Sequence, residues 1–204
     1  MILVFCELKD GKLRKASAEA LSEGRRLADA AGLPLGALVV GANADGANDA
    51  ANYGADQVVT ITGPQLASYS SDAFAVAVAE AVKAKGATVL LASATALGKD
   101  VAPRVAARLG AGYAADVTAV SMEGGKLQAV RPVYAGKALA TTVFSSDVQI
   151  ATTRVNIFQA VPKAGAGALE ALPAPPMDFK AVVKEILAKA TGKPDLTEAN
   201  IIVS

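Results

Sequence analysis

The hydrophobic pattern of the first half of the chain alternates between short apolar runs and longer amphipathic stretches. The apolar runs are typical of buried strands, and they predict β-strands at residues 2–8, 35–40, 57–61 and 89–91. Helical spacing in between predicts helices over residues 18–31 and 48–53, and a third from residue 71 or 72 to Gly86. Alternating strands and helices favour a three-layer α/β/α fold with a mostly parallel sheet.

After Gly112 the spacing of apolar residues changes from a helical repeat to every second residue. Two hairpins are predicted, one with strands 116–121 and 126–133 around the turn 123–125, the other with strands 139–144 and 148–155 around the turn 145–147. We expect these segments to be antiparallel additions to the sheet, or a flap upon it.

The pattern predicts a boundary near residue 161. Residues 1–161 form the expected α/β domain, and the Pro-, Gly- and Ala-rich residues 162–177 resemble a linker. Residues 178–204 predict an amphipathic helix, capped by Asp178 and running to Lys189, followed by the start of a further strand.

The turn after the strand at 89–91 is the strongest candidate for a ligand site. We expect Asp100 to cap a helix that continues to Leu109, with Pro103 in its first turn. Free N–H groups at such a helix start favour anions, so the candidate nucleotide contacts are Thr95, Gly98, Lys99 and Asp100. The sequence of this turn does not match a P-loop. A serine stands where that motif has its first glycine, and an aspartate stands where it has Ser or Thr.

Composition excludes several classes of function. The chain has 20 Lys and Arg against 19 Asp and Glu, so no overall field attracts nucleic acid or an anionic membrane. It has no histidine, the usual general base and the commonest metal ligand, and we expect neither catalytic residues nor a metal site. Its only cysteine, Cys6, is expected to be buried in the first strand. No run is long enough to span a membrane and no leader pattern opens the chain, which predicts a cytoplasmic bacterial protein.

Three further motifs in the sequence do not carry a catalytic or binding function. Residues 110–115 loosely spell G-x-G-x-x-A, but they follow a predicted helix and precede a strand, the reverse of the dinucleotide-binding context. An ATP pyrophosphatase needs a Ser-Gly-Gly-x-Asp loop after the first strand, and residues 7–11 do not match it. Arg131 and Tyr134 lie near a strand end, and we expect structural or interfacial roles for them.

Motifs spread over the whole chain resemble the N-terminal domain of the electron transfer flavoprotein alpha subunit. They are ILVFCEL at the start, YGAD at 53–56, TALGKD at 95–100 with APR at 102–104, RPVYAG at 131–136, DLTEA at 195–199 and IVS at 202–204. The resemblance implies an adenine-nucleotide-hydrolase-like α/β domain that acts as scaffold and subunit interface and is not itself an enzyme. In this family Val-Ser leads into the FAD-binding domain, so the FAD site is expected beyond Ser204.

The resemblance also implies the partners. The intact heterodimer with the beta subunit, which binds AMP in many members, carries electrons through FAD from acyl-CoA-type or other dehydrogenases to a quinone oxidoreductase. The alternative is a stand-alone adenine-nucleotide-binding module, in which Lys99 would contact the phosphate.

Overall fold

The computed structural model of the chain describes residues 1–177, together with 183, 185 and 203. The helix expected over residues 178–189 and the strand expected near residue 201 fall largely outside this part. All statements below concern the described residues.

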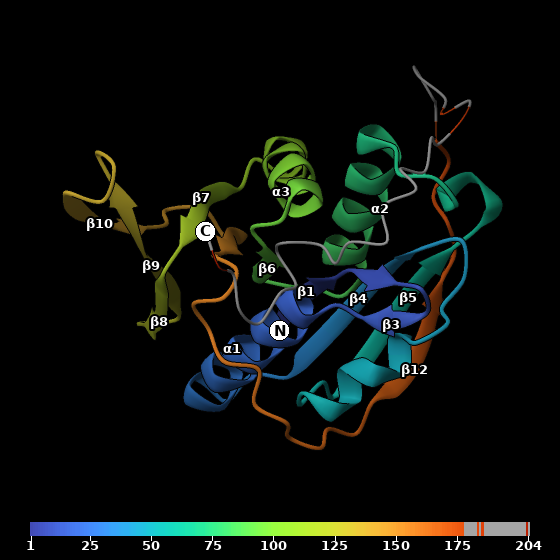
Figure 1. Cartoon of the computed structure of the whole chain (residues 1–204), viewed down its shortest axis with the longest axis horizontal. Coiled ribbons are helices and arrows are strands. Elements are labelled where there is room, and N and C mark those ends of the chain that lie inside the picture. The colour runs from blue at the N-terminus through green and yellow to red at the C-terminus, as the bar shows by residue number, and fades with distance from the viewer. Residues whose placement is uncertain (178–182, 184, 186–202, 204) are drawn as a thin grey trace.

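A seven-stranded parallel sheet forms the centre of the molecule (Figure 1). Its spatial order is β12-β5-β4-β1-β6-β11-β7. The strands are β1 (Ile2–Cys6), β4 (Leu35–Gly41), β5 (Gln57–Thr62), β6 (Val89–Ser93), β7 (Gly112–Val117), β11 (Gln149–Thr153) and β12 (Ala168–Leu172). Every neighbouring pair is parallel.

Helices cover both faces of this sheet, which confirms the predicted α/β/α layers. One face packs on α1 (Lys15–Ala31), and the other packs on α2 (Ser71–Ala84) and α3 (Ala96–Leu109). Because side chains alternate along a strand, β1 sends Ile2 and Val4 to the α1 side and Leu3 and Phe5 to the opposite side. Two short 3-10 helices, η1 (Ala47–Asn52) and η2 (Pro64–Leu66), lie in the connections.

A three-stranded antiparallel sheet projects from the body beside β7 (Figure 1). It consists of β8 (Ala119–Glu123), β9 (Lys126–Val133) and β10 (Ala138–Val143), and is called the arm below. The strands β8 and β9 form the first predicted hairpin, around Gly124 and Gly125. A small hairpin of β2 (Leu8–Lys9) and β3 (Lys12–Leu13) follows β1.

The second predicted hairpin is wrong. The strand β10 pairs with β9, whereas β11 lies parallel between β6 and β7. All five β11 residues are buried. A strand that is covered on both faces lacks the alternation of apolar and polar residues that is typical of a half-exposed antiparallel strand, so the sequence does not show whether it pairs in parallel or antiparallel.

The linker prediction for residues 162–177 is wrong for β12, which forms one edge of the central sheet. This strand has the sequence ALEAL. Its pairing with β5 depends on tertiary contacts, which cannot be predicted from an Ala-rich composition.

Two helix starts also differ from the prediction. The helix α3 begins after Thr95, so Asp100 lies inside it and Pro103 stands beyond the first turn. The helix α1 begins after Arg14, three residues before the predicted start at residue 18, which leaves Ser17 inside the helix. There Ser17 accepts a hydrogen bond of 2.8 Å from the backbone N–H of Glu7.

Candidate functional site

The candidate site lies at the carboxyl edge of the sheet, where β1 and β6 are neighbours. The chain leaves β1 toward α1 and β4, and it leaves β6 toward α3 on the other face. The connections diverge at this point, which is the usual ligand position in open α/β sheets. A cavity of about 460 Å³ opens here. Its lining includes Glu7, Arg14, Gly41, Asn43, Tyr69 and Leu97.

A buried carboxylate occupies the start of α3. Glu7 follows directly after β1 and accepts hydrogen bonds from the Thr95 hydroxyl and from Arg14, the latter at 2.9 Å. The Thr95 hydroxyl in turn accepts a hydrogen bond of 3.0 Å from the backbone N–H of Gly98. The helix start, its cap and one internal anion therefore form a connected polar network in which Glu7 supplies the negative charge that such a helix end favours.

Burial dominates the electrostatics of Glu7. It raises the pKa of this carboxyl above its ordinary value, while the hydrogen bond from Thr95 and the charge of Arg14 oppose the increase. The ion pair with Arg14 therefore compensates only part of the cost of placing a carboxylate in the protein interior.

Gly98 allows α3 to approach the end of β6. A Cβ atom at this position would lie 2.0 Å from the carbonyl oxygen of Ser93. Only glycine fits so close to a backbone oxygen, and this glycine therefore serves the packing of the turn.

The structure gives the other two predicted nucleotide contacts different surroundings. Asp100 accepts hydrogen bonds from the Tyr69 hydroxyl and from Arg104 Nε, the latter at 3.0 Å. The Tyr69 bond first, and Arg104 second, lower the pKa of Asp100. Lys99 is exposed, and its charge acts on Asp116.

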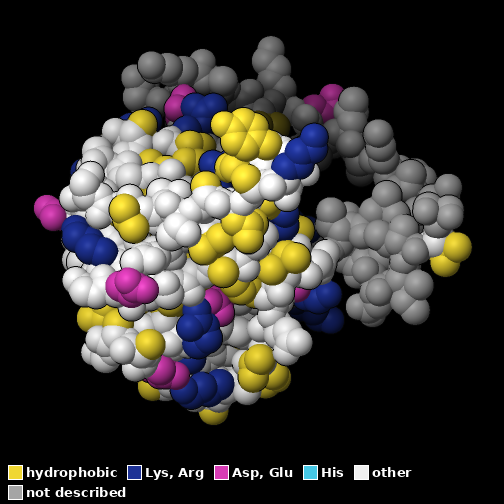
Figure 2. Space-filling view, turned by 90° about the vertical axis from the view of Figure 1, so that its left-hand side faces the viewer, with side chains coloured by type: hydrophobic (Ala, Val, Ile, Leu, Met, Phe, Trp, Pro, Cys, Tyr) yellow, Lys and Arg dark blue, Asp and Glu magenta, His cyan; other side chains and the backbone are white. Residues whose placement is uncertain are grey.

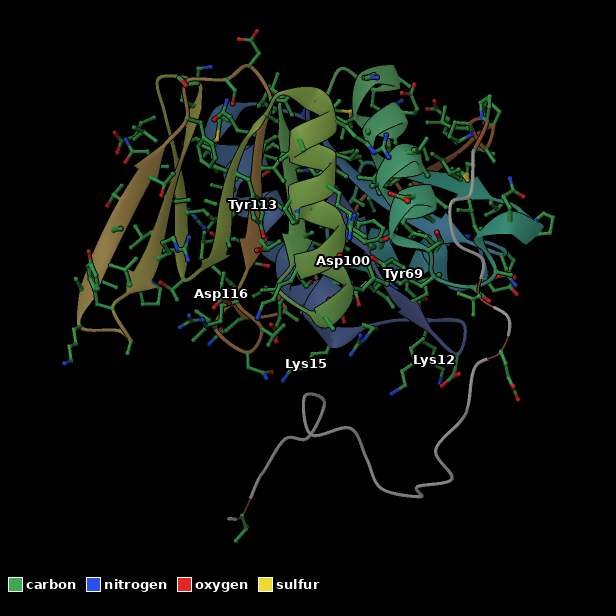
Figure 3. All side chains as sticks on the ribbon, turned by 90° about the horizontal axis from the view of Figure 1, so that it is seen from above. Lys12, Lys15, Tyr69, Asp100, Tyr113 and Asp116 are labelled. Carbon is green, nitrogen blue, oxygen red and sulfur yellow. The ribbon has the colours of Figure 1, made fainter. Side chains whose placement is uncertain are left out.

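Asp116 is the centre of a second polar cluster, at the carboxyl ends of β7 and β11 (Figure 3). Arg154 donates a hydrogen bond of 2.7 Å to its carboxylate, and Thr152 Oγ1 accepts one of 2.9 Å from its backbone N–H. The Arg154 bond is the main cause that lowers the pKa of Asp116, with Lys99 and Arg131 contributing by charge. The φ of Asp116 is 57°, the left-handed region that aspartate tolerates better than most residues.

The sequence motif RPVYAG forms the end of β9 and the turn into β10. Tyr134 is 81% exposed, and Arg131 Nε is a buried nitrogen that has no hydrogen-bond partner among the described residues. Within the described residues, no hydrogen bond links Arg131 or Tyr134 to the network of Glu7. Structural or interfacial roles for them remain predictions.

Sequence reasoning missed the two residues that organise the site, Glu7 and Arg14. A single glutamate after a strand carries no motif. The only available signal was its position, because a polar residue directly after a buried central strand lies at the edge where ligands bind.

No cluster of three or more potential metal-ligating side chains occurs within the described residues. None of the helices in that part of the chain is both long and apolar enough to cross a membrane.

The fold and the site define an α/β domain of nucleotide-binding architecture whose anion position is filled by its own carboxylate. The Electron transfer flavoprotein domain family matches residues 2–177. The chain belongs to the electron transfer flavoprotein family, as its motifs predicted.

Several curated relatives are similar to this chain in sequence. Protein FixB of Clostridium saccharobutylicum is 37% identical over 209 residues, and an electron transfer flavoprotein subunit alpha of Bacillus subtilis (strain 168) is 33% identical over 206 residues. Both alignments cover all of this chain, which spans 63% of the length of each relative. The acryloyl-CoA reductase electron transfer subunit beta of Anaerotignum propionicum is 34% identical over 167 residues, covering 70% of this chain and 46% of the relative.

Proposed function

We propose that this chain is the scaffold and subunit-interface domain of an electron transfer flavoprotein alpha subunit. In the intact protein it pairs with a beta subunit that binds AMP. The heterodimer carries electrons through FAD from acyl-CoA-type or other dehydrogenases to a quinone oxidoreductase. Relatives named as alpha subunits, which are longer than this chain, support the assignment.

The position of Glu7 is the main support for the scaffold role. A nucleotide bound at the start of α3 would place its phosphate beside the helix N–H groups. Here Thr95 accepts the Gly98 N–H and donates to the Glu7 carboxylate, which would repel a phosphate at close range.

The described residues do not fit the pyrophosphate of FAD at this edge of the sheet, for the same reason. We therefore assign the flavin to residues beyond Ser204 of the longer protein, together with the beta subunit. The present chain contributes no step of the electron transfer itself, and its role is to support and position the chains that hold the cofactors.

Flavin content tests this proposal. The chain of residues 1–204, purified without a beta subunit, should show no flavin absorbance. The full-length alpha subunit co-expressed with its beta subunit should contain stoichiometric FAD. Stoichiometric flavin in the 1–204 chain alone would contradict the scaffold role.

The second candidate function is a stand-alone adenine-nucleotide-binding module. The cavity at the carboxyl edge favours it, because its volume lies within the range of small-molecule sites. Calorimetric titration of the chain with AMP and ATP separates the two functions. Heat of nucleotide binding would support the module, and absence of heat would support the scaffold.

A further inference from the structure

Three basic side chains lie around Asp116 at the carboxyl edge of the sheet. Lys99 comes from the first turn of α3, Arg131 from β9 in the arm, and Arg154 from the segment that follows β11. Arg154 donates a hydrogen bond of 2.7 Å to the Asp116 carboxylate, and the charges of Lys99 and Arg131 act on the same carboxylate. These four residues are called the Asp116 cluster below. One carboxylate stands against three cations, so the cluster has an excess of positive charge.

Backbone hydrogen bonds bring the two arginines of the cluster together. The N–H of Arg154 donates a hydrogen bond of 2.9 Å to the carbonyl oxygen of Val117, and the N–H of Thr118 donates one of 2.8 Å to the carbonyl oxygen of Val130. The end of β11 and the strand β9, which carries Arg131, are therefore both joined to the two residues that follow the carboxylate. The cluster results from the backbone arrangement and does not depend on a chance contact of flexible side chains.

Arg131 lies on the face of the arm that packs against the body. Because side chains alternate along a strand, Arg131 shares a face of β9 with Leu127 and Ala129. Both of these are buried in the hydrophobic cluster that also contains side chains of α1 and β1. Arg131 therefore continues the packed face of the arm beyond this core, and its guanidinium is brought to the carboxyl edge rather than to the solvent side of the arm.

Two cations of the cluster lack partners. Arg131 Nε is buried, and it donates no hydrogen bond within the residues that the structure describes. Among the same residues, neither Arg131 nor Lys99 forms a salt bridge. A buried donor without an acceptor costs free energy, and in native proteins such a donor is usually satisfied by an acceptor. An acceptor bound between the arm and the body would supply the partner that Arg131 Nε lacks.

The donors of the cluster match the oxygens of a small oxyanion. An arginine guanidinium presents its N–H groups in a planar fork that fits a carboxylate or a phosphate, and the ammonium of Lys99 adds a point charge. After Asp116 has balanced one cation, two positive charges are left over. A ligand with two negative charges would balance them.

The excess of positive charge is local. The whole chain has 20 Lys and Arg against 19 Asp and Glu. Figure 2, which views the molecule from the arm side, shows basic and acidic side chains interspersed over this face. Nucleic acid or an anionic lipid surface would require a broad basic surface, so the cluster fits a small ligand better.

We propose that the Asp116 cluster binds a small oxyanion ligand with two negative charges, a phosphate or a dicarboxylate, through Lys99, Arg131 and Arg154. Asp116 is a positioning residue in this site, because its hydrogen bond holds Arg154 in place. The site differs from the network of Glu7, where the carboxylate of the chain itself accepts from the helix cap. The inference goes beyond the proposed function, since a scaffold domain needs no ligand of its own.

The test is calorimetric titration of the full-length alpha subunit, in complex with its beta subunit, with inorganic phosphate and separately with succinate. Low ionic strength keeps the charge interactions unscreened. Arg131→Gln and Lys99→Gln should each raise the Kd of the bound anion by about tenfold or more, because each removes a charged donor. The matched control is Arg108→Gln, since Arg108 lies in the last turn of α3, at the other end of the helix from Lys99. This control should leave the Kd unchanged.

The choice of anion identifies the ligand class. Binding of phosphate alone assigns a phosphate ligand, binding of succinate alone assigns a dicarboxylate, and binding of both shows recognition by charge. Each of these results supports the site if the two variants weaken binding and the control does not. AMP heat that inorganic phosphate suppresses and Arg131→Gln removes also arises at this cluster, and it does not count for the nucleotide-binding module.

Two results would overturn the site. One is the absence of binding by both anions, and the other is a Kd that is the same in Arg131→Gln, Lys99→Gln and Arg108→Gln. Sedimentation of each variant shows whether the complex with the beta subunit is intact. Lys99→Gln changes an exposed helix position and serves if Arg131→Gln disturbs folding or assembly. Failure of this inference leaves the scaffold role unaffected, because flavin content tests that role separately.

Discussion

Glu7 is the residue on which the proposed scaffold role depends. It lies at the position where the architecture favours an anion, and it is held there by Thr95 and Arg14. Because the carboxylate is part of the chain, it occupies the helix start without the entropy loss that a free ligand would incur. The same carboxylate is poorly solvated, so its presence makes the stability of the domain depend on pH.

Replacement of Glu7 by glutamine should flatten that pH dependence. Burial raises the Glu7 pKa in the folded protein, so the unfolded chain releases this proton first as the pH rises. The free energy of unfolding therefore falls from about pH 4.5, the ordinary value for glutamate, through the raised folded pKa. Urea unfolding of Glu7→Gln across this interval should show a smaller decrease than the wild type.

The control for that measurement is Glu80→Gln. Glu80 lies on the surface of α2 and pairs with Lys83 at 2.9 Å, so its replacement changes a solvated carboxylate only. This variant should retain the wild-type pH profile. An identical profile for Glu7→Gln and the wild type would show that burial does not control the Glu7 carboxyl.

At the scale of the element, α3 depends on its close approach to β6. Gly98 is a helical residue, and alanine in a helix interior is ordinarily favoured over glycine by about 1 kcal/mol. A Cβ at this position would nevertheless collide with the Ser93 carbonyl oxygen, which belongs to the backbone and has little freedom to move.

Gly98→Ala should therefore destabilise the domain by about 1–3 kcal/mol, the reverse of the effect expected from helix propensity. Gly41→Ala is the matched control, since its new Cβ would meet only an ordinary contact of 3.6 Å with the oxygen of Asn43. Thermal unfolding of both variants is the measurement. A stabilised Gly98→Ala protein would contradict the close packing of α3.

The elements differ in how well the sequence predicts them. The strands β1, β4, β5 and β6 were predicted because each is an apolar run between turn residues, and this pattern identified the parallel core of the fold. The direction of β11 was not predictable, because QIATT is buried on both faces and its partners come from distant segments. The cap of α3 was misplaced because Thr95 and Asp100 are both good capping residues, and contacts with β1 decide between them.

The candidate site was predictable only in part, for a related reason. The turn after β6 was found from its residue types, and Thr95 and Gly98 do meet there. Glu7 and Arg14 flank the hairpin that follows β1, so their meeting with Thr95 depends on which strands are neighbours in the sheet. That order is a tertiary property.

At the scale of the whole molecule, the arm and the body differ in how they place their apolar side chains. The body buries its apolar residues on both faces of the central sheet, whereas the arm presents Tyr134, Leu139 and Val143 to the outside. This division fits a domain whose function lies in assembly rather than in a reaction within its own cavity.

Charge reversal at Arg131 should weaken assembly without unfolding the domain. Arg131→Glu reverses the charge of a residue for which we expect an interfacial role, so the Kd for the beta subunit should rise by about tenfold or more. Arg108→Glu, in the last turn of α3, is the control for a charge change elsewhere. Unchanged affinity in a folded Arg131→Glu protein would refute an interfacial role for this arginine.

The most direct test of the account is native mass spectrometry of the full-length alpha subunit that contains this chain, co-expressed with its beta subunit. The account predicts one complex that holds both subunits and FAD, and a separately expressed 1–204 chain that binds neither flavin nor AMP. A 1–204 chain that carries flavin or AMP by itself, or a full-length protein that forms no complex with the beta subunit, would contradict the claim that this domain is a scaffold and interface.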